Sequence, residues 1–124
     1  MSKVFDDVAL FMNAVGQPVA DSPKEEDDIA RLYKKLIKEE YEEFLEADSE
    51  NDDVERLDAC FDMIWVIVGY MHSRGWNCPL SWVEGAQSNL TKINPETGKV
   101  RRRESDGKVL KPDGWKEPDF KQFI

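Results

Sequence analysis

Glutamates concentrate in one short segment of this chain, residues 38–46, which read KEEYEEFLE. If the segment is a helix turning about 100° per residue, Glu40 and Glu43 fall within its apolar side and Glu39 at the edge of that side. A carboxylate that faces a protein core is costly unless it is paired or binds a cation. Oxygen ligands without nitrogen or sulfur favour magnesium or manganese. The segment therefore predicts a site for Mg²⁺ or Mn²⁺.

A second acidic segment, residues 55–62, reads ERLDACFD and places Asp58 and Asp62 one helical turn apart on the same face. The polar residues 48–53 between the two segments are typical of a turn, which predicts an antiparallel helical hairpin. Residues equally far from such a turn lie level with one another. The hairpin thus brings the two aspartates beside the glutamates of the first segment.

These two arguments, helical phase and hairpin register, select a common set of candidate site residues. We expect Glu40, Glu43, Asp58 and Asp62 to hold the metal ion. Glu39 lies off the centre of the apolar side, so it is the better candidate for a general base or a ligand of a second metal ion.

Four amphipathic segments must position these carboxylates, and their apolar periodicity predicts an all-α fold. The expected helices are residues 3–15, 25–48, about 53–73 and about 79–90. The third helix is apolar on nearly all sides and needs cover on every side. We therefore expect a homo-oligomer, a dimer or a tetramer, with this helix near the interface.

The helical period ends after Ile93, and the remaining residues change in composition. Residues 100–103 and 108–110 resemble a small hairpin around an Asp-Gly turn. We expect residues 1–93 to form a helical catalytic bundle and residues 94–124 to form a basic tail of the same single domain.

Charge is unevenly distributed along the 124 residues. The net charge of the chain is −9, yet residues 92–124 contain 9 basic and 6 acidic side chains. An acidic body argues against a nucleic-acid polymer as partner, because phosphate neutralisation needs a basic face. A small phosphate compound held between a metal ion and the basic tail is compatible with this distribution.

The chain has two cysteines, and neither a signal-peptide pattern nor an apolar run long enough to span a bilayer. We therefore expect a reduced, cytoplasmic protein that does not bind a membrane. The only histidine, His72, lies on an apolar helical stripe and is expected to pack rather than to catalyse.

Five sequence blocks occur in order along nearly the whole chain: FDDVALFMNAVGQPV, LIKEEYEEFLEA, DACFDMIWVIVG, SNLTK and DGKVLKP. Together they resemble the all-α nucleoside triphosphate pyrophosphohydrolases, which include MazG-like enzymes, phosphoribosyl-ATP pyrophosphohydrolase and the dimeric dUTPases. The short form with a basic tail is most similar to phage-borne members, which implies the host cytoplasm as location. The resemblance implies magnesium-dependent cleavage between the α and β phosphates, yielding a monophosphate and pyrophosphate.

The resemblance also maps family motifs onto this chain. The EExxE motif falls on the three glutamates of residues 38–46 named above. The later ExxD motif ends on Asp62, but the residue three positions earlier is Ala59, which leaves Asp58 or Glu55 as the fourth ligand.

The last two blocks imply substrate-binding residues, namely Asn89 and Lys92 in the first of them and Lys108 and Lys111 in the second. Lysines near a triphosphate neutralise its charge. The sequence does not fix the base, and the phage-like resemblance favours a purine, dGTP or GTP. Two alternatives stay open: a phosphoribosyl-ATP pyrophosphohydrolase, and a non-catalytic acidic helical module that binds cations or a basic partner.

Overall fold

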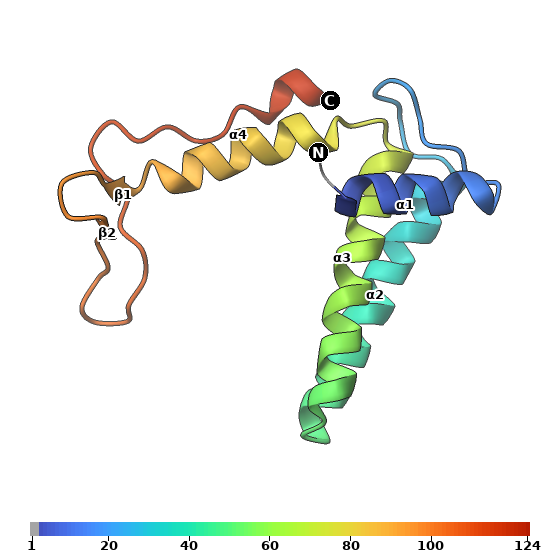
Figure 1. Cartoon of the computed structure of the whole chain (residues 1–124), viewed down its shortest axis with the longest axis horizontal. Coiled ribbons are helices and arrows are strands. Elements are labelled where there is room, and N and C mark those ends of the chain that lie inside the picture. The colour runs from blue at the N-terminus through green and yellow to red at the C-terminus, as the bar shows by residue number, and fades with distance from the viewer. Residues whose placement is uncertain (1–2) are drawn as a thin grey trace. The chain divides into compact units, whose positions relative to one another are not determined.

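The computed structural model describes residues 3–124, in which four α-helices account for most of the chain (Figure 1). The helices are α1 (Lys3–Ala14), α2 (Asp28–Ser49), α3 (Asp53–Ser73) and α4 (Cys78–Leu90). The predicted all-α class with four main helices is confirmed. α2 begins at Asp28 rather than at residue 25, because the carboxylate of Asp27 caps the helix and accepts from the backbone N–H of Ala30 at 2.9 Å.

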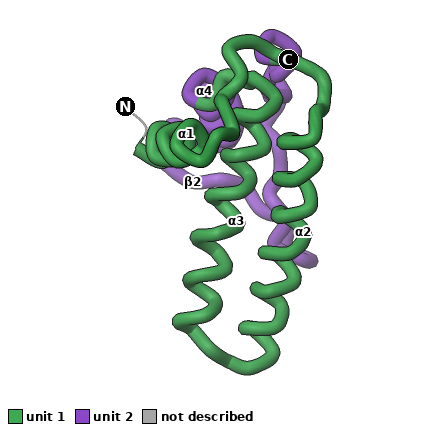
Figure 2. Tube along the Cα trace, turned by 90° about the vertical axis from the view of Figure 1, so that its right-hand side faces the viewer, with its two compact units in different colours: residues 1–78, 124 green, residues 79–123 purple. Residues whose placement is uncertain are grey.

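The chain divides into two compact units, residues 1–78 together with Ile124, and residues 79–123 (Figure 2). The first unit contains α1, α2 and α3. The second unit contains α4, apart from its first residue Cys78, and the chain that follows it up to residue 123. The expected division after Ile93, between helical bundle and basic tail, concerns function and stays a prediction. No described helix is both long enough and apolar enough to span a bilayer.

α2 and α3 form the antiparallel hairpin that the polar linker predicts (Figure 2). The chain reverses at Asn51, whose φ of 55° lies in the left-handed region that asparagine tolerates. Asp52 then caps α3 with its carboxylate. Arg56 ties the turn together by donating from Nη2 to the carbonyl oxygen of Asp48 and to Oδ1 of Asn51, each at 3.1 Å. The register of the hairpin is thus held at its closed end.

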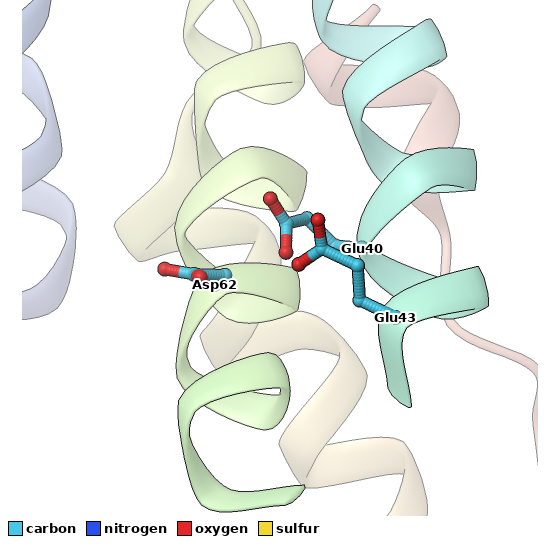
Figure 3. A group of neighbouring side chains, drawn as sticks. All are labelled: Glu40, Glu43 and Asp62. Atoms are coloured by element: carbon cyan, nitrogen blue, oxygen red, sulfur yellow. The ribbon is translucent and has the colours of Figure 1, made fainter. Parts of the chain in front are cut away.

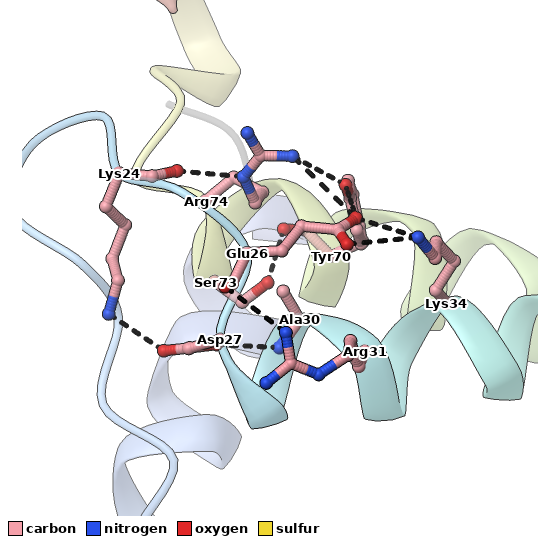
Figure 4. A network of polar contacts seen from close by, with 9 residues as sticks. All are labelled: Lys24, Glu26, Asp27, Ala30, Arg31, Lys34, Tyr70, Ser73 and Arg74. Carbon is pink, nitrogen blue, oxygen red and sulfur yellow. Dashed lines mark hydrogen bonds and ion pairs between the residues drawn. The ribbon is translucent and has the colours of Figure 1, made fainter.

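A polar network holds the open end of the same hairpin (Figure 4). Tyr70 donates its hydroxyl to Oε1 of Glu26 at 2.7 Å, and Lys34 donates to both oxygens of Glu26 at 3.0 Å. Arg74 donates from Nη1 to the Tyr70 hydroxyl and from Nε to the carbonyl oxygen of Lys24. Because both ends are fastened, the side chains between them keep one register.

α1 packs across α3 and completes the core of the first unit. The buried apolar cluster consists of Val8, Met12, Tyr33, Val66, Val68 and Cys78. His72 is buried beside this cluster, and its Nε2 lies 2.9 Å from the carbonyl oxygen of Phe5 on α1. This contact is the packing role expected for His72.

Gly69 allows α2 and α3 to approach closely in this core. A Cβ at this position would lie 2.3 Å from Cε1 of Tyr33, which no side chain can tolerate without a shift. Tyr33 is itself held by the hydrogen bond that its hydroxyl donates to Oε1 of Gln17 at 2.7 Å. The narrow spacing of the hairpin therefore depends on glycine.

The second unit continues from α4 into a two-stranded antiparallel sheet. β1 (Ile93–Asn94) pairs with β2 (Lys99–Val100), an element that helical periodicity alone could not reveal. The predicted hairpin around the Asp-Gly turn is confirmed as a bridge between Arg102 and Val109, and Gly107 in that turn has a φ of 75°. A short 3₁₀ helix, Phe120–Phe123, follows.

Candidate metal centre

Three carboxylates from the two helices of the hairpin meet at one place (Figure 3). Glu40 and Glu43 come from α2 and Asp62 comes from α3. One oxygen of each lies within 4.8 Å of one oxygen of each of the others. The spacing of three places both glutamates on the side of α2 that faces α3, and the fastened register sets Asp62 beside them.

Glu40 is the most constrained member of this acidic cluster, which we define as Glu40, Glu43 and Asp62. Its Oε2 is buried and has no hydrogen-bond partner among the described residues. Burial raises the pKa of Glu40 to about 7, and the adjacent carboxyl group of Glu43 and the charges of Asp62 and Asp58 act in the same direction. A buried carboxylate without a donor is unstable in the ionised form unless a cation is present.

Asp62 is half-buried, and burial together with the charges of Asp58 and Glu43 raises its pKa as well. Asp58 is exposed and lies outside the set of mutually close oxygens, although its charge reaches both Glu40 and Asp62. Glu55 is also exposed. Three of the four expected metal ligands, Glu40, Glu43 and Asp62, therefore lie together, and Asp58 acts on them only through its charge.

The donor set fits a hard divalent cation. It offers only oxygen atoms, and two of its three side chains are half-buried. Mg²⁺ typically takes few protein carboxylates and completes its shell with water and phosphate oxygens. The unpartnered Oε2 of Glu40 is the atom that such an ion would satisfy. The residues present thus fit Mg²⁺ or Mn²⁺.

The other two glutamates of the EExxE segment are exposed on α2. Glu42 lies 3.8 Å from Nζ of Lys38 in an exposed ion pair, so it belongs to the solvent side of the helix as helical phase predicts. Glu39 stands outside the acidic cluster. Its expected role as general base stays a prediction.

Two of the four expected substrate-binding residues, Lys92 and Lys111, contact Trp115 in the second unit. Lys92 donates to Oδ1 of Asn89 at 3.0 Å, and its Nζ lies 5.0 Å from the centroid of the Trp115 ring. Nζ of Lys111 lies 4.6 Å from the same centroid. Lys108 is exposed and makes no such contact. Sequence reasoning did not identify Trp115, whose indole N–H anchors it to the carbonyl oxygen of Ser88 at 2.8 Å.

Comparison with known proteins supports the reading of the acidic hairpin. The sequence profile of the phosphoribosyl-ATP pyrophosphohydrolase family matches residues 8–79, which contain all of α2 and α3 and therefore every expected metal ligand. No curated protein matches the chain. This family belongs to the superfamily of MazG-like nucleoside triphosphate pyrophosphohydrolases that the sequence motifs resemble. Because the match spans more than half of the chain, the protein is a member of the phosphoribosyl-ATP pyrophosphohydrolase family, hydrolases that cleave a phosphoric anhydride of a nucleotide.

Proposed function

We propose that this chain cleaves a nucleoside triphosphate between its α and β phosphates and releases a nucleoside monophosphate and pyrophosphate. The observation that carries the proposal is the acidic cluster, three carboxylates from two helices with one buried oxygen that has no hydrogen-bond partner. MazG-like pyrophosphohydrolases typically depend on a divalent metal ion. Membership of an enzyme family also argues against the alternative of a non-catalytic cation-binding module.

In this proposal Glu40, Glu43 and Asp62 hold Mg²⁺ or Mn²⁺, with Asp58 as the neighbouring fourth carboxylate. A divalent cation at such a site stabilises charge on phosphate oxygens and lowers the pKa of water. Glu39 accepts the proton of the attacking water, whose oxygen forms the new bond to phosphorus as the bond to the pyrophosphate oxygen breaks. No side chain has to form a covalent intermediate.

The basic residues of the second unit supply charge for the substrate. We propose that Asn89, Lys92, Lys108 and Lys111 bind the phosphates, as the motif resemblance implies. Lys92 and Lys111 both contact the ring of Trp115. Because these contacts already restrict the two side chains, each lysine loses less conformational entropy when it binds a phosphate. These residues lie beyond the segment that the family profile matches, so their role rests on the motif resemblance.

A substrate panel tests the function and separates its two candidates. The motif resemblance favours a purine, dGTP or GTP, whereas membership of the phosphoribosyl-ATP pyrophosphohydrolase family favours phosphoribosyl-ATP. The eight common ribonucleotides and deoxyribonucleotides and phosphoribosyl-ATP should be assayed for pyrophosphate release with Mg²⁺. We expect release from at least one nucleoside triphosphate. Release from phosphoribosyl-ATP alone would select the second candidate, and release from none would contradict the proposed function.

We further propose that a second copy of this chain covers the exposed apolar face of α3. Five large apolar side chains on this helix are 46–76% exposed: Val54, Leu57, Phe61, Ile64 and Ile67. A monomer rarely leaves so continuous an apolar stripe in water. Light scattering of the purified protein should therefore give the mass of a dimer or tetramer, and Leu57→Glu should shift it toward the monomer. A monomer at micromolar concentration would contradict this interface.

A cytoplasmic location is the remaining part of the proposal. Cys60 is a free thiol. Cys78 is buried, and burial raises its pKa to about 11, so its thiolate is scarce at neutral pH. A free thiol such as that of Cys60 is typical of a reducing compartment.

A further inference from the structure

The second unit contains a cavity of about 440 Å³, and of the residues assigned above only Lys92 lines it. Residues 91–96 form one side of it, and Leu110, Pro112 and Asp113 form another. Lys99 of β2 and Arg101, which follows β2, complete the lining. All of these residues belong to the second unit and lie beyond the segment matched by the family profile. A cavity of this volume is within the range of small-molecule sites.

Two cations of this cavity, Lys99 and Arg101, take no part in the salt bridge that neutralises Arg103 in the same tail. Arg101 and Lys99 make no side-chain ion pair in the part of the chain that the structure describes. Arg103, by contrast, is neutralised by Asp106, whose Oδ1 lies 2.9 Å from its Nε. Arg102 follows Arg101 in an extended segment, where successive side chains point to opposite faces, and it does not line the cavity.

Apolar side chains complete the cavity wall. Ile93 and Leu110 line it together with Lys92, the residue that already contacts Asn89. Apolar walls keep water away from a bound charge and so strengthen its attraction to nearby cations.

Two carboxylates, Glu96 and Asp113, also line the cavity. With the cations Lys92, Lys99 and Arg101 they leave the lining with a net charge of +1. So small a net charge favours a compact anion over a nucleic-acid polymer, whose binding needs an extended basic face.

We propose that this cavity is a binding site for a short polyphosphate chain, a di- or triphosphate, with Arg101 and Lys99 as its principal cations. Arginine presents a planar fork of donors that matches phosphate oxygens, and lysine adds a flexible point charge. The proposal rests on the proposed function in one respect, because the nucleotide substrate of that reaction carries such a chain. Lys99 and Arg101 are then further substrate-binding residues.

The test uses the full chain with inorganic tripolyphosphate as probe, in the absence of divalent cations. Backbone amide shifts measured by nuclear magnetic resonance should change in residues 91–113. The double variant Lys99→Gln/Arg101→Gln should weaken tripolyphosphate binding at least tenfold in calorimetry. The matched control, Arg102→Gln/Lys121→Gln, also removes two positive charges, but from residues that do not line the cavity. It should change the affinity for tripolyphosphate less than twofold.

Two results would overturn the site. One is a set of amide shifts confined to residues outside 91–113. The other is an equal loss of tripolyphosphate affinity in both double variants, because binding would then depend only on the net charge of the protein. Competition with a non-hydrolysable nucleoside triphosphate identifies the source of the chain. Displacement assigns the site to the phosphates of the substrate, and no displacement assigns it to a free polyphosphate, with the site supported in both cases. The binding experiment measures no turnover. A negative result in it therefore does not bear on the substrate panel, and a negative result in the panel does not bear on the binding of tripolyphosphate.

Discussion

Glu40→Gln is expected to lower the rate of pyrophosphate release by roughly 100-fold or more and to raise the melting temperature of the metal-free protein. The carboxylate is placed with Glu43 and Asp62 where it would bind the cation, so the uncharged amide removes a ligand. The same amide removes a charge from a position where burial and neighbouring carboxylates raise the pKa of Glu40 to about 7. Relief of that repulsion should stabilise the apo protein by about 1–3 kcal/mol. Thermal unfolding and a pyrophosphate assay check both parts.

A matched control variant is available on the same helix. Glu42→Gln removes an equal charge from an exposed side chain that pairs with Lys38 on the solvent side of α2. We expect its activity to stay within twofold of the unchanged protein, because exposed ion pairs of this kind contribute little. Asp62→Asn should behave as Glu40→Gln does. A large loss of stability in both cluster variants would show that these acids are structural, with basic partners that the described residues do not reveal.

The acidic cluster was predictable because it depends on two regular geometries. Helical phase selects Glu40 and Glu43 from the glutamates of α2, and a short polar turn sets the level of Asp62 on α3. Neither step needs knowledge of any side-chain conformation. Helical phase and register do not suffice for Asp58: it was expected beside the glutamates, yet its side chain is exposed and lies outside the acidic cluster.

The network at the open end of the hairpin was not predictable in this way. Glu26 and Tyr70 are 44 positions apart, and their hydrogen bond depends on how the loop before α2 is placed against the end of α3. Glu26 precedes the helix and carries no periodic signal. The ion pair that Arg74 makes with Glu26, at 3.9 Å, is likewise decided by tertiary distances.

The part of the second unit that follows α4 was not predictable from helical periodicity, for a related reason. Each strand of the β1–β2 pair has only two residues, so the sequence cannot show the alternation of apolar and polar residues that identifies a strand. The contacts of Trp115 join Lys92 to the later stretch that contains Lys111 and Trp115. The cavity lined by Lys99 and Arg101 results from the same folding back of the chain.

Chelation of divalent cations is expected to abolish pyrophosphate release and to lower the melting temperature of the protein. Without a cation, the ionised carboxylates of the acidic cluster repel one another and Oε2 of Glu40 has no partner among the described residues. An ion that binds only the folded chain stabilises it by mass action. Differential scanning calorimetry with EDTA and with added Mg²⁺ or Mn²⁺ measures the effect, and the Glu40→Gln variant serves as control because its response to the ion should be small. Undiminished turnover in EDTA would contradict the metal mechanism.

The pH dependence of this stabilisation follows from the direction in which the pKa of Glu40 is shifted. The pKa is about 7 in the folded chain and 4.5 in its unperturbed state, so between these values the folded chain retains a proton that the unfolded chain has lost. The stability of the metal-free protein should therefore fall as pH rises from 4.5 to 7, and the penalty should be complete above 7. Cation binding requires the ionised carboxylate, so the rise in melting temperature caused by Mg²⁺ should be small at pH 5 and large at pH 8. An equal rise at both pH values would mean that the ion binds elsewhere, at carboxylates that are already ionised at pH 5.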